Sequence, residues 1–345
     1  MTFLCIYAII LKIIKINTSE NTVVSYIILK KVLKIALKVL IALLALLLIV
    51  RGILNIFKFV IYSDYYSIET TVCDNPGLSD GFVCQGICAL EDKGKIFVSG
   101  YMADKSASRI YVTDYESNSY FVLLAHEDGK EFTGHAGGIA VWGDRVYIAN
   151  GGKLYFASAE AILNSKEGDV VTVTVGAEVN NSASFVFADE NYVYVGEFHD
   201  GGAYVTEHPY ETKNGMQYAI VSKYSHENLT TPLKIYSIPN KVQGMCITDS
   251  GKIIFSTSYG LTDSEYLVYD ESGARDSGLT LDGASVFILE DRIMQINGPA
   301  MSEELDFSNG KVITLSESAS DKYIFGKFFF ANDIVALDFD SILEK

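Results

Sequence analysis

Two histidines stand directly before glycine-rich turns, where an imidazole could carry out acid–base chemistry. His135 precedes the sequence Ala-Gly-Gly, and His199 precedes Asp-Gly-Gly. Glycines let the backbone come close to a ligand, and an imidazole can act as base, acid or metal ligand near neutral pH. His135 is therefore our first candidate for a general base. The alternative is a histidine that hydrogen-bonds a neighbouring sheet and only fixes the geometry of the fold.

Carboxylates form a second candidate group. Glu303, Glu304, Glu197 and Asn150 offer hard oxygen ligands that would suit a Ca²⁺ ion, and such an ion could polarise a carbonyl group. The chain has no Asp-x-Asp-x-Asp-Gly loop, so we expect no cofactor and keep calcium as the alternative. Two of these carboxylates could instead cleave a glycoside, depending on their separation. The sequence has no Walker loop, Rossmann fingerprint or Gly-x-Ser-x-Gly elbow, and it assigns no catalytic residue.

A repeated pair of strands must position these residues. An apolar segment is followed by a second segment rich in aromatic or β-branched residues, and this pair recurs with a period of roughly 45–60 residues. The pattern predicts an all-β chain with a β-propeller. We expect five blades, and six stays open because 202–210 and 283–289 could hold further strands. The segment 66–72 could supply the outer strand that the last repeat lacks and so close the ring. The repeats begin with the segments 85–100, 138–149, 184–196, 243–256 and 304–315.

The candidate site follows from the geometry of a propeller. The inner strand of each blade begins, and the second strand ends, at the same end of the ring, so these positions converge around the axis. They form a candidate ligand-binding funnel, unless the polar groups only satisfy each other and bound water. Glu317 also takes such a position, whereas His126, His208 and His226 lie in acidic loops and should be solvated. The candidate funnel residues are Gln85, Tyr101, His135, Asn150, Glu197, His199, Gln243, Tyr259, Glu303 and Glu304.

The N-terminal part predicts a membrane anchor. Residues 32–50 are apolar enough to cross a bilayer as a helix, and most of the nearby lysines precede them. This charge excess predicts a cytoplasmic N-terminus and an extracytoplasmic C-terminal domain. A cleaved signal peptide is the alternative, although no Ala-x-Ala-like site follows. The predicted parts are a cytoplasmic tail (1–31), an anchor and its flank (32–57), a stalk with a closing strand (58–80) and a propeller (81–345).

Charge and cysteines narrow the function further. Residues 1–61 hold eight Lys or Arg and one acidic residue, whereas the remainder holds 19 basic and 42 acidic residues. An acidic domain is repelled by nucleic acid, so we expect no nucleic-acid partner. Cys73 and Cys84 flank a turn and could form a disulfide in an exported domain. Cys88 and Cys246 occupy the same position in two repeats, which predicts small inward-facing apolar side chains.

Four segments carry a family resemblance. Their sequences are TGHAGGIAV (133–141), VQGMCIT (242–248), PAMSEELD (299–306) and SESASDKYIFGK (316–327). With these segments, residues 80–330 resemble membrane-anchored or secreted β-propeller proteins of low-GC Gram-positive bacteria. The resemblance implies a propeller and an extracytoplasmic location, and it implies no reaction.

Three functions are therefore open. The first is a membrane-anchored module that binds a cell-envelope component, a glycan or a protein through the funnel. The second is a propeller hydrolase or lactonase with an axial divalent ion or with His135 as base. The third is an interaction scaffold that uses the rims of the blades. The sequence favours the binding module.

Overall fold

The computed structural model describes residues 20–323 and 331–343, and the chain divides into two compact units. These are Met1–Ile56 and Phe57–Lys345. The second unit begins before residue 81, where the predicted propeller starts, because helix α3 and strand β1 also pack within it. Helices within it are short: α3 (Ser63–Ile68), α4 (Ala159–Leu163) and α5 (Asp340–Leu343), with 3₁₀ turns η1 (Glu91–Lys93), η2 (Glu271–Gly273) and η3 (Glu317–Ala319).

Helix α2 (Glu20–Ile61) is one continuous helix that contains the predicted span. Its stretch Leu29–Ile61 is long and apolar enough to cross a membrane. Apolar side chains along it, such as Leu46 and Ile49, are exposed in the chain by itself. The prediction of an N-terminal apolar helix is therefore confirmed.

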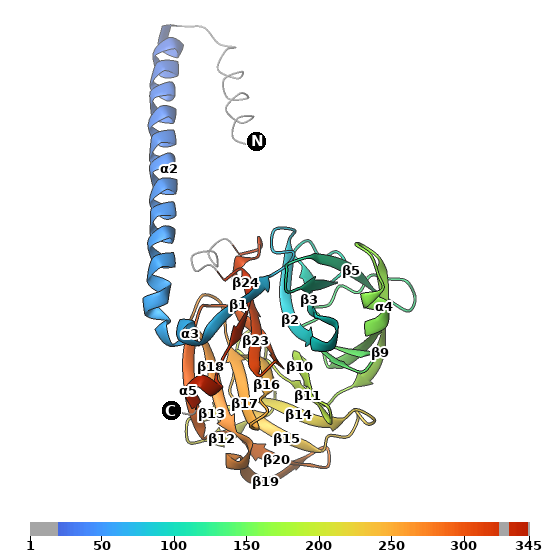
Figure 1. Ribbon diagram of the computed structural model, residues 1–345. Helices are drawn as coiled ribbons and strands as arrows, with labels where there is room; N and C mark the ends of the chain where they lie inside the picture. Colours follow the sequence, from blue (N-terminus) through green and yellow to red (C-terminus); the bar gives the residue numbers. More distant parts are fainter. Residues whose placement is uncertain (1–19, 324–330, 344–345) are drawn as a thin grey trace. The chain divides into compact units, whose positions relative to one another are not determined.

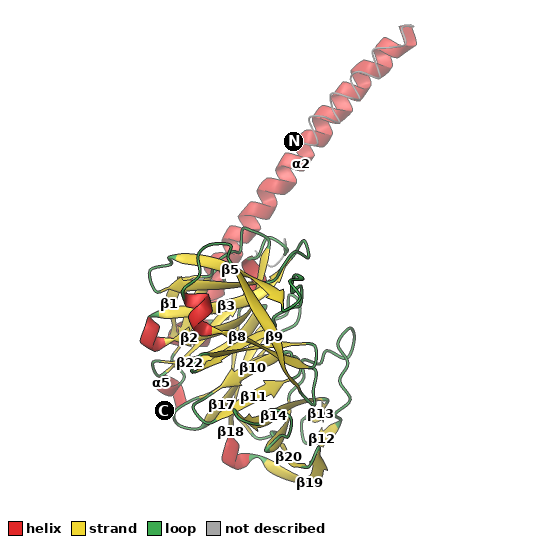
Figure 2. Cartoon of the chain, turned by 90° about the vertical axis from the view of Figure 1, so that its right-hand side faces the viewer, coloured by secondary structure: helices red, strands yellow, loops and turns green. Residues whose placement is uncertain are grey.

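The second unit is built almost entirely of antiparallel strands (Figure 2). Within residues 57–323 and 331–343, the strands form sheets of eight, six, four, four and two strands. We divide them along the chain into five groups of four antiparallel strands, which we number repeats 1 to 5. Repeat 1 contains β2 (Phe82–Leu90), β3 (Lys95–Met102), β4 (Arg109–Asp114) and β5 (Ser119–His126), and repeat 2 contains β6 (Gly138–Trp142), β7 (Arg145–Asn150), β8 (Lys153–Ser158) and β9 (Val170–Glu178). Repeat 3 contains β10 (Phe185–Ala188), β11 (Tyr192–Gly196), β14 (Ala219–Ser225) and β15 (Lys234–Ile238), and repeat 4 contains β16 (Val242–Ile247), β17 (Lys252–Thr257), β18 (Ser264–Asp270) and β21 (Arg292–Gly298). Repeat 5 contains β22 (Ser302–Ser308), β23 (Lys311–Ser316), β24 (Asp333–Leu337) and β1 (Glu69–Asp74).

The first strands of the repeats form a closed ring, and three of them, β2, β10 and β16, lie in the middle of the second unit in Figure 1. Strand β2 contacts β6, β6 contacts β10, β10 contacts β16, β16 contacts β22, and β22 returns to β2. This cyclic order is that of a propeller, in which each sheet radiates from an inner strand. The prediction of an all-β, propeller-like fold is confirmed.

Strand β1 closes the ring. It pairs antiparallel with β24, from Glu69 opposite Leu337 to Asp74 opposite Asp333. The first strand of the unit therefore becomes the outer strand of the last repeat, as predicted from the segment 66–72. Closure covers the edge of β24, which would otherwise offer unpaired backbone groups to other chains. The segment 322–328, which the sequence predicts as a further strand of this last repeat, lies mostly outside the described residues.

Two inserted hairpins take up long intervals within repeats 3 and 4. Strands β12 (Tyr210–Thr212) and β13 (Gly215–Gln217) pair only with each other. Strands β19 (Arg275–Leu281) and β20 (Ala284–Ile288) also pair, and β20 extends repeat 3 through a parallel contact with β15. Neither hairpin builds a further four-stranded sheet among the described residues. A second parallel pair, β5 with β9, joins the outer edges of repeats 1 and 2.

The four cysteines of the second unit are buried and free. Cys88 and Cys246 are 6% and 0% exposed, as expected of inward-facing apolar residues. The hypothesised disulfide between Cys73 and Cys84 is wrong for this structure. The Sγ of Cys84 instead accepts a hydrogen bond from Nδ2 of Asn75 (3.2 Å) and donates to a backbone carbonyl. Burial raises the pKa of the Cys73 thiol to about 11, so it stays protonated near neutral pH.

The closing strand leads to a first prediction. A fragment that begins at residue 76 loses β1 and α3 and with them the buried side chains of Tyr65, Ile68 and Cys73. Each fully buried apolar side chain contributes about 1.5–3 kcal/mol, and a domain has only about 5–15 kcal/mol in total. We expect no cooperative thermal transition for this fragment, whereas the fragment 57–345 should unfold cooperatively. Equal melting temperatures of the two fragments would contradict the role of β1.

Candidate functional site

One carboxylate binds the inner strands of three repeats. Glu304 is fully buried, and its Oε2 accepts hydrogen bonds from the backbone N–H groups of Ile87 (2.9 Å) and Ile139 (2.8 Å). Its Oε1 accepts one from the N–H of Val186 (3.0 Å). Burial raises the pKa of Glu304 well above its usual range, and the three N–H bonds counteract this shift. A Cβ on Gly138 would collide with the carboxylate, so the close approach requires glycine there.

A cavity of about 660 Å³ contains most of the predicted funnel residues. Glu197, His199 and Glu304 do not line it, because each is buried in contacts of its own. The lining also includes Glu317, Lys322, Tyr323 and Tyr204. The predicted residues that line the cavity are Gln85, Tyr101, His135, Asn150, Gln243, Tyr259 and Glu303.

Three β-bulges aim side chains at this cavity. The register of the inner strand shifts between Cys84 and Gly86 in β2 and between Val242 and Gly244 in β16, which leaves Gln85 and Gln243 as the extra residues. A similar shift in β22 includes Glu303 and Glu304. A bulge inserts a residue and re-aims its side chain. It thereby allows Glu303 to line the cavity while its neighbour Glu304 binds the inner strands.

Glu303 and Glu317 form a carboxyl pair in the cavity wall. Glu303 is 3% exposed, and its Oε1 lies 3.5 Å from Nε2 of Gln243. Oε2 of Glu317 accepts hydrogen bonds from Nε2 of Gln85 (3.0 Å) and from the hydroxyl of Tyr323 (3.1 Å). Burial raises the pKa of Glu317 to about 7. Burial, and then the charge of Glu317, raises the pKa of Glu303 well above its usual range.

Lys322 lies among aromatic side chains beside this pair. Its Nζ donates a hydrogen bond to the hydroxyl of Tyr101 and lies 4.5 Å from the centre of that ring and 4.9 Å from that of Tyr323. The positive charge lowers the pKa of both carboxyl groups and counteracts their burial. The ring of His135 packs 4.8 Å from that of Tyr101. Burial and then Lys322 lower the pKa of His135, which favours a neutral imidazole that could accept a proton.

The four predicted oxygen ligands do not fit a calcium site. Glu304 is occupied by backbone N–H groups, and Oδ1 of Asn150 accepts the backbone N–H of His135 (2.8 Å). Glu197 binds His208 and two backbone N–H groups. In the part of the chain that the structure describes, no three His, Cys, Asp or Glu side chains are placed to hold a metal ion. The axial-ion hypothesis therefore finds no set of ligands here.

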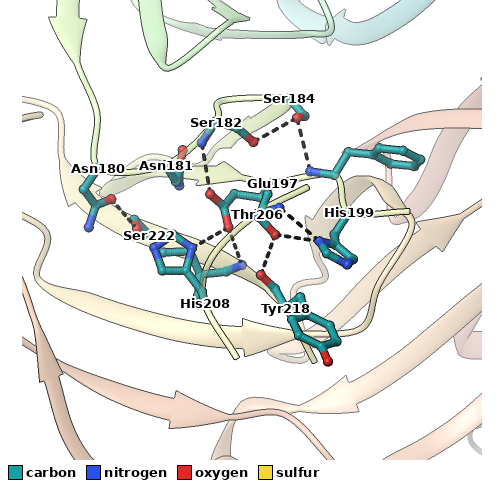
Figure 3. Close-up of polar contacts among 12 residues, drawn as sticks. Asn180, Asn181, Ser182, Ser184, Glu197, His199, Thr206, His208, Tyr218 and Ser222 are labelled. Carbon is teal, nitrogen blue, oxygen red and sulfur yellow. Dashed lines mark hydrogen bonds and ion pairs between the residues drawn. The ribbon is translucent and has the colours of Figure 1, made fainter. Parts of the chain in front are cut away.

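The insertion between β11 and β14 is fixed by two histidines (Figure 3). Nδ1 of His208 lies 2.8 Å from Oε2 of Glu197, whose carboxylate also accepts the N–H groups of Ser182 and Ile220. Nδ1 of His199 accepts the backbone N–H of Thr206 (3.1 Å). The expectation that His208 is solvated is therefore wrong, because the chain folds it back onto a buried carboxylate. The backbone here carries residues 203–206 into the cavity wall.

His226 is the second histidine that the expectation of solvation missed. It is 3% exposed, and its ring stacks on Trp142 with a centroid distance of 4.1 Å. Its Nδ1 lies 3.0 Å from the hydroxyl of Tyr147.

The sequence did not predict Lys322 and Tyr323 as cavity-lining residues, because they lie in a turn after η3 and occupy no strand position. A lysine next to a tyrosine in a loop carries no spacing that would distinguish it.

Comparison with known proteins gives structural likeness only. No protein-family model and no curated protein matches the chain. The PQQ-bound aldose sugar dehydrogenase of Streptomyces coelicolor is 14% identical, with a TM-score of 0.41 over 72% of this chain and 77% of that one. An oxidoreductase from Thermus thermophilus, described as a glucose dehydrogenase, is 10% identical, with a TM-score of 0.40 over 78% and 99% of the two chains.

A nidogen–laminin complex is also similar, with 8% identity and a TM-score of 0.39 over 68% of this chain and 73% of that one. The three structures are thus two dehydrogenases and one protein complex. At these identities and TM-scores, they give no argument about what this chain binds or catalyses.

The contacts of Glu304 lead to a second prediction. In Glu304→Gln, an amide NH₂ must face at least one backbone N–H that now donates to the carboxylate. A buried donor without an acceptor costs about 1–3 kcal/mol, so we expect the free energy of unfolding to fall by at least this amount in chemical denaturation. Glu116→Gln, at an exposed turn, is the matched control and should change it by less than about 0.5 kcal/mol. Equal losses for the two variants would contradict the account.

The His208–Glu197 pair leads to a third prediction. The hydrogen bond to Glu197 raises the pKa of His208 above its ordinary value of 6.5, and the charges of Asp282 and Glu207 act in the same direction. The folded state therefore holds the proton more tightly than the unfolded state. The stabilisation is fully present below about pH 6.5 and is lost as the pH rises through the folded pKa.

We therefore expect wild type and His208→Ala to differ most in free energy of unfolding at pH 5.5–6.5 and less at pH 8.5. Urea denaturation over this range measures the difference. A gap between the two proteins that is constant with pH, or that widens at high pH, would contradict the pairing.

Proposed function

We propose that this chain is a five-bladed β-propeller hydrolase, anchored in a membrane through α2, that acts on a sugar-derived ring bound in the cavity. The proposal rests on one observation, the buried pair of carboxyl groups in the cavity wall whose pKa values are both raised. Ionisable groups with strongly shifted pKa values in a cleft are typical of catalytic sites. The closed ring of five inner strands supports the blade count.

The two environments suggest different roles for Glu303 and Glu317. Glu303 is the more deeply buried of the two, and burial raises its pKa well above the usual range, which favours the protonated form and suits a general acid. Glu317 has a pKa of about 7 and is partly ionised at that pH, which suits a general base. Glu317 would take a proton from water as its oxygen attacks the anomeric or carbonyl carbon. Glu303 would donate its proton to the ring or glycosidic oxygen as that bond breaks.

The remaining lining suits a polyhydroxylated substrate. The amides of Gln85, Gln243 and Asn150 can each donate and accept hydrogen bonds from hydroxyl groups. A few convergent polar groups in a mostly preformed cavity fix the orientation of a ligand. The neutral imidazole of His135 is an alternative base, as the sequence suggested.

The charge distribution supports an extracytoplasmic location of the second unit. The lysines before the apolar stretch favour an N-terminus in the cytoplasm and a C-terminal domain outside it. An extracytoplasmic domain would meet cell-envelope glycans and not nucleic acid, which its acidic composition repels.

Binding without turnover is the second candidate function. The observation that favours it is the aromatic side of the cavity, where Tyr204 and Tyr259 are 48% and 45% exposed. Such a module would hold the same class of ligand and would not need an ionisable carboxyl pair.

A fourth prediction tests the hydrolase. With p-nitrophenyl glycosides and glucono-1,5-lactone as substrates, we expect kcat/KM to rise with pH through about 7, because Glu317 must be ionised. Glu317→Gln should lose about 10²–10⁴-fold in kcat/KM and the rise near pH 7, and Glu116→Gln should behave as wild type. Binding of these compounds with equal, negligible turnover in wild type and Glu317→Gln would sink the hydrolase and favour the binding module.

A further inference from the structure

The cavity has an aromatic side that the carboxyl chemistry does not use. Tyr204, in the insertion between β11 and β14, and Tyr259, after β17, both line the cavity and are 48% and 45% exposed. Phe198 lies between them, with ring centroids 5.4 Å from Tyr204 and 6.1 Å from Tyr259. Phe198 is 8% exposed and so supports the other two rings from behind. We call Tyr204, Tyr259 and Phe198 the aromatic rim.

Asp200 holds both exposed tyrosines. Its Oδ1 accepts the backbone N–H groups of Gly202 and Tyr204, both at 2.8 Å. Its carboxylate also accepts the hydroxyl of Tyr259, and this hydrogen bond raises the pKa of that tyrosine. Two rings from different repeats are thereby fixed at the same edge of the cavity. Rigid aromatic rings provide contact area at low cost in conformational entropy.

The base of the insertion is anchored independently of the aromatic rim. His208 pairs with the buried Glu197, and Thr206 bonds to His199 and to the carbonyl of Tyr218, so that the contacts converge where the insertion leaves β11 (Figure 3). Farther out, Glu290 accepts the backbone N–H of Lys213 (3.0 Å). The aromatic rim is therefore positioned by the fold before any ligand binds.

The chemistry of the aromatic rim matches one kind of ligand. Its ring faces are apolar, whereas the tyrosine hydroxyls and Asp200 keep its edge polar. A pyranose ring has the complementary pattern, with apolar C–H faces and hydroxyl groups around its periphery. An acyl chain would leave the polar edge without partners. The cavity volume of about 660 Å³ falls within the roughly 300–1,000 Å³ of pockets that bind drug-sized ligands.

We infer that the aromatic rim is a second sugar subsite, and that the preferred substrate of this cavity is a glycan of two or more rings. One ring binds at the carboxyl pair, and the next stacks on Tyr204 and Tyr259. The inference rests on the proposed function for the first ring, and it identifies Tyr204 and Tyr259 as determinants of substrate length.

Binding of defined sugars to the full-length protein in detergent tests the inference. The probes are cellotriose, maltotriose and chitotriose with their monosaccharides glucose and N-acetylglucosamine, measured by calorimetry. We expect at least one trisaccharide to bind tenfold or more tightly than its monosaccharide. Tyr204→Ala and Tyr259→Ala should abolish that advantage, whereas Tyr204→Phe and Tyr259→Phe should keep most of it because the ring face remains. Tyr115→Ala, at an exposed tyrosine outside the cavity lining, is the matched control.

Two outcomes would overturn the subsite. One is that no trisaccharide binds more tightly than its monosaccharide. The other is that the alanine variants keep the trisaccharide advantage. Glu317→Gln separates this inference from the proposed hydrolase. If it changes neither turnover nor its pH dependence while the trisaccharide advantage persists, the hydrolase fails and the subsite stands. If turnover needs Glu317 but trisaccharides gain nothing, the subsite fails and the hydrolase stands.

Discussion

A buried carboxylate at the meeting point of the inner strands is the constraint on which this fold depends. Glu304 accepts backbone N–H groups from β2, β6 and β10 while itself belonging to β22. It therefore links four repeats through one side chain, and each link requires a particular register of the strand involved. Glycine at position 138 is part of the same constraint, since any larger residue would displace the carboxylate. The geometry of the cavity depends on these registers, because the cavity wall begins one residue away at Glu303.

The same stretch of β22 combines a structural and a chemical role. The side-chain oxygens of Glu304 accept backbone N–H groups. Among the described residues, the carboxyl group of Glu303 has only a weak contact with Gln243 at 3.5 Å. A structural carboxylate is stabilised by donors that satisfy it, whereas a reactive one must keep capacity to exchange a proton. Burial raises the pKa of both, and their partners distinguish them. Two neighbouring glutamates can thus have different roles when a bulge points their side chains in different directions.

The sequence predicted the strands well, because each repeat alternates apolar segments with turns in a pattern that only a sheet satisfies. It also predicted seven residues of the cavity wall, since the ends of inner and second strands must converge in a propeller. It could not distinguish Glu303 from Glu304, because a bulge is a tertiary feature without a sequence period. It placed Glu197 and His199 in the funnel and His208 in solvent, because loop insertions fold back according to contacts that strand periodicity does not encode. Lys322 and Tyr323 were beyond its reach for the same reason.

The pairing of β1 with β24 has a consequence for biosynthesis. The ribosome makes β1 before any other strand of the propeller and β24 after all the others, yet the two are neighbours in the finished sheet. Contacts between such distant parts of a chain form late, because the loop between them must first be ordered. The nascent chain therefore passes through a stage in which four repeats can pair internally while the fifth stays open. During that stage, exposed strand edges favour association with other chains, so the synthesis of β24 is also the step that protects the domain from aggregation.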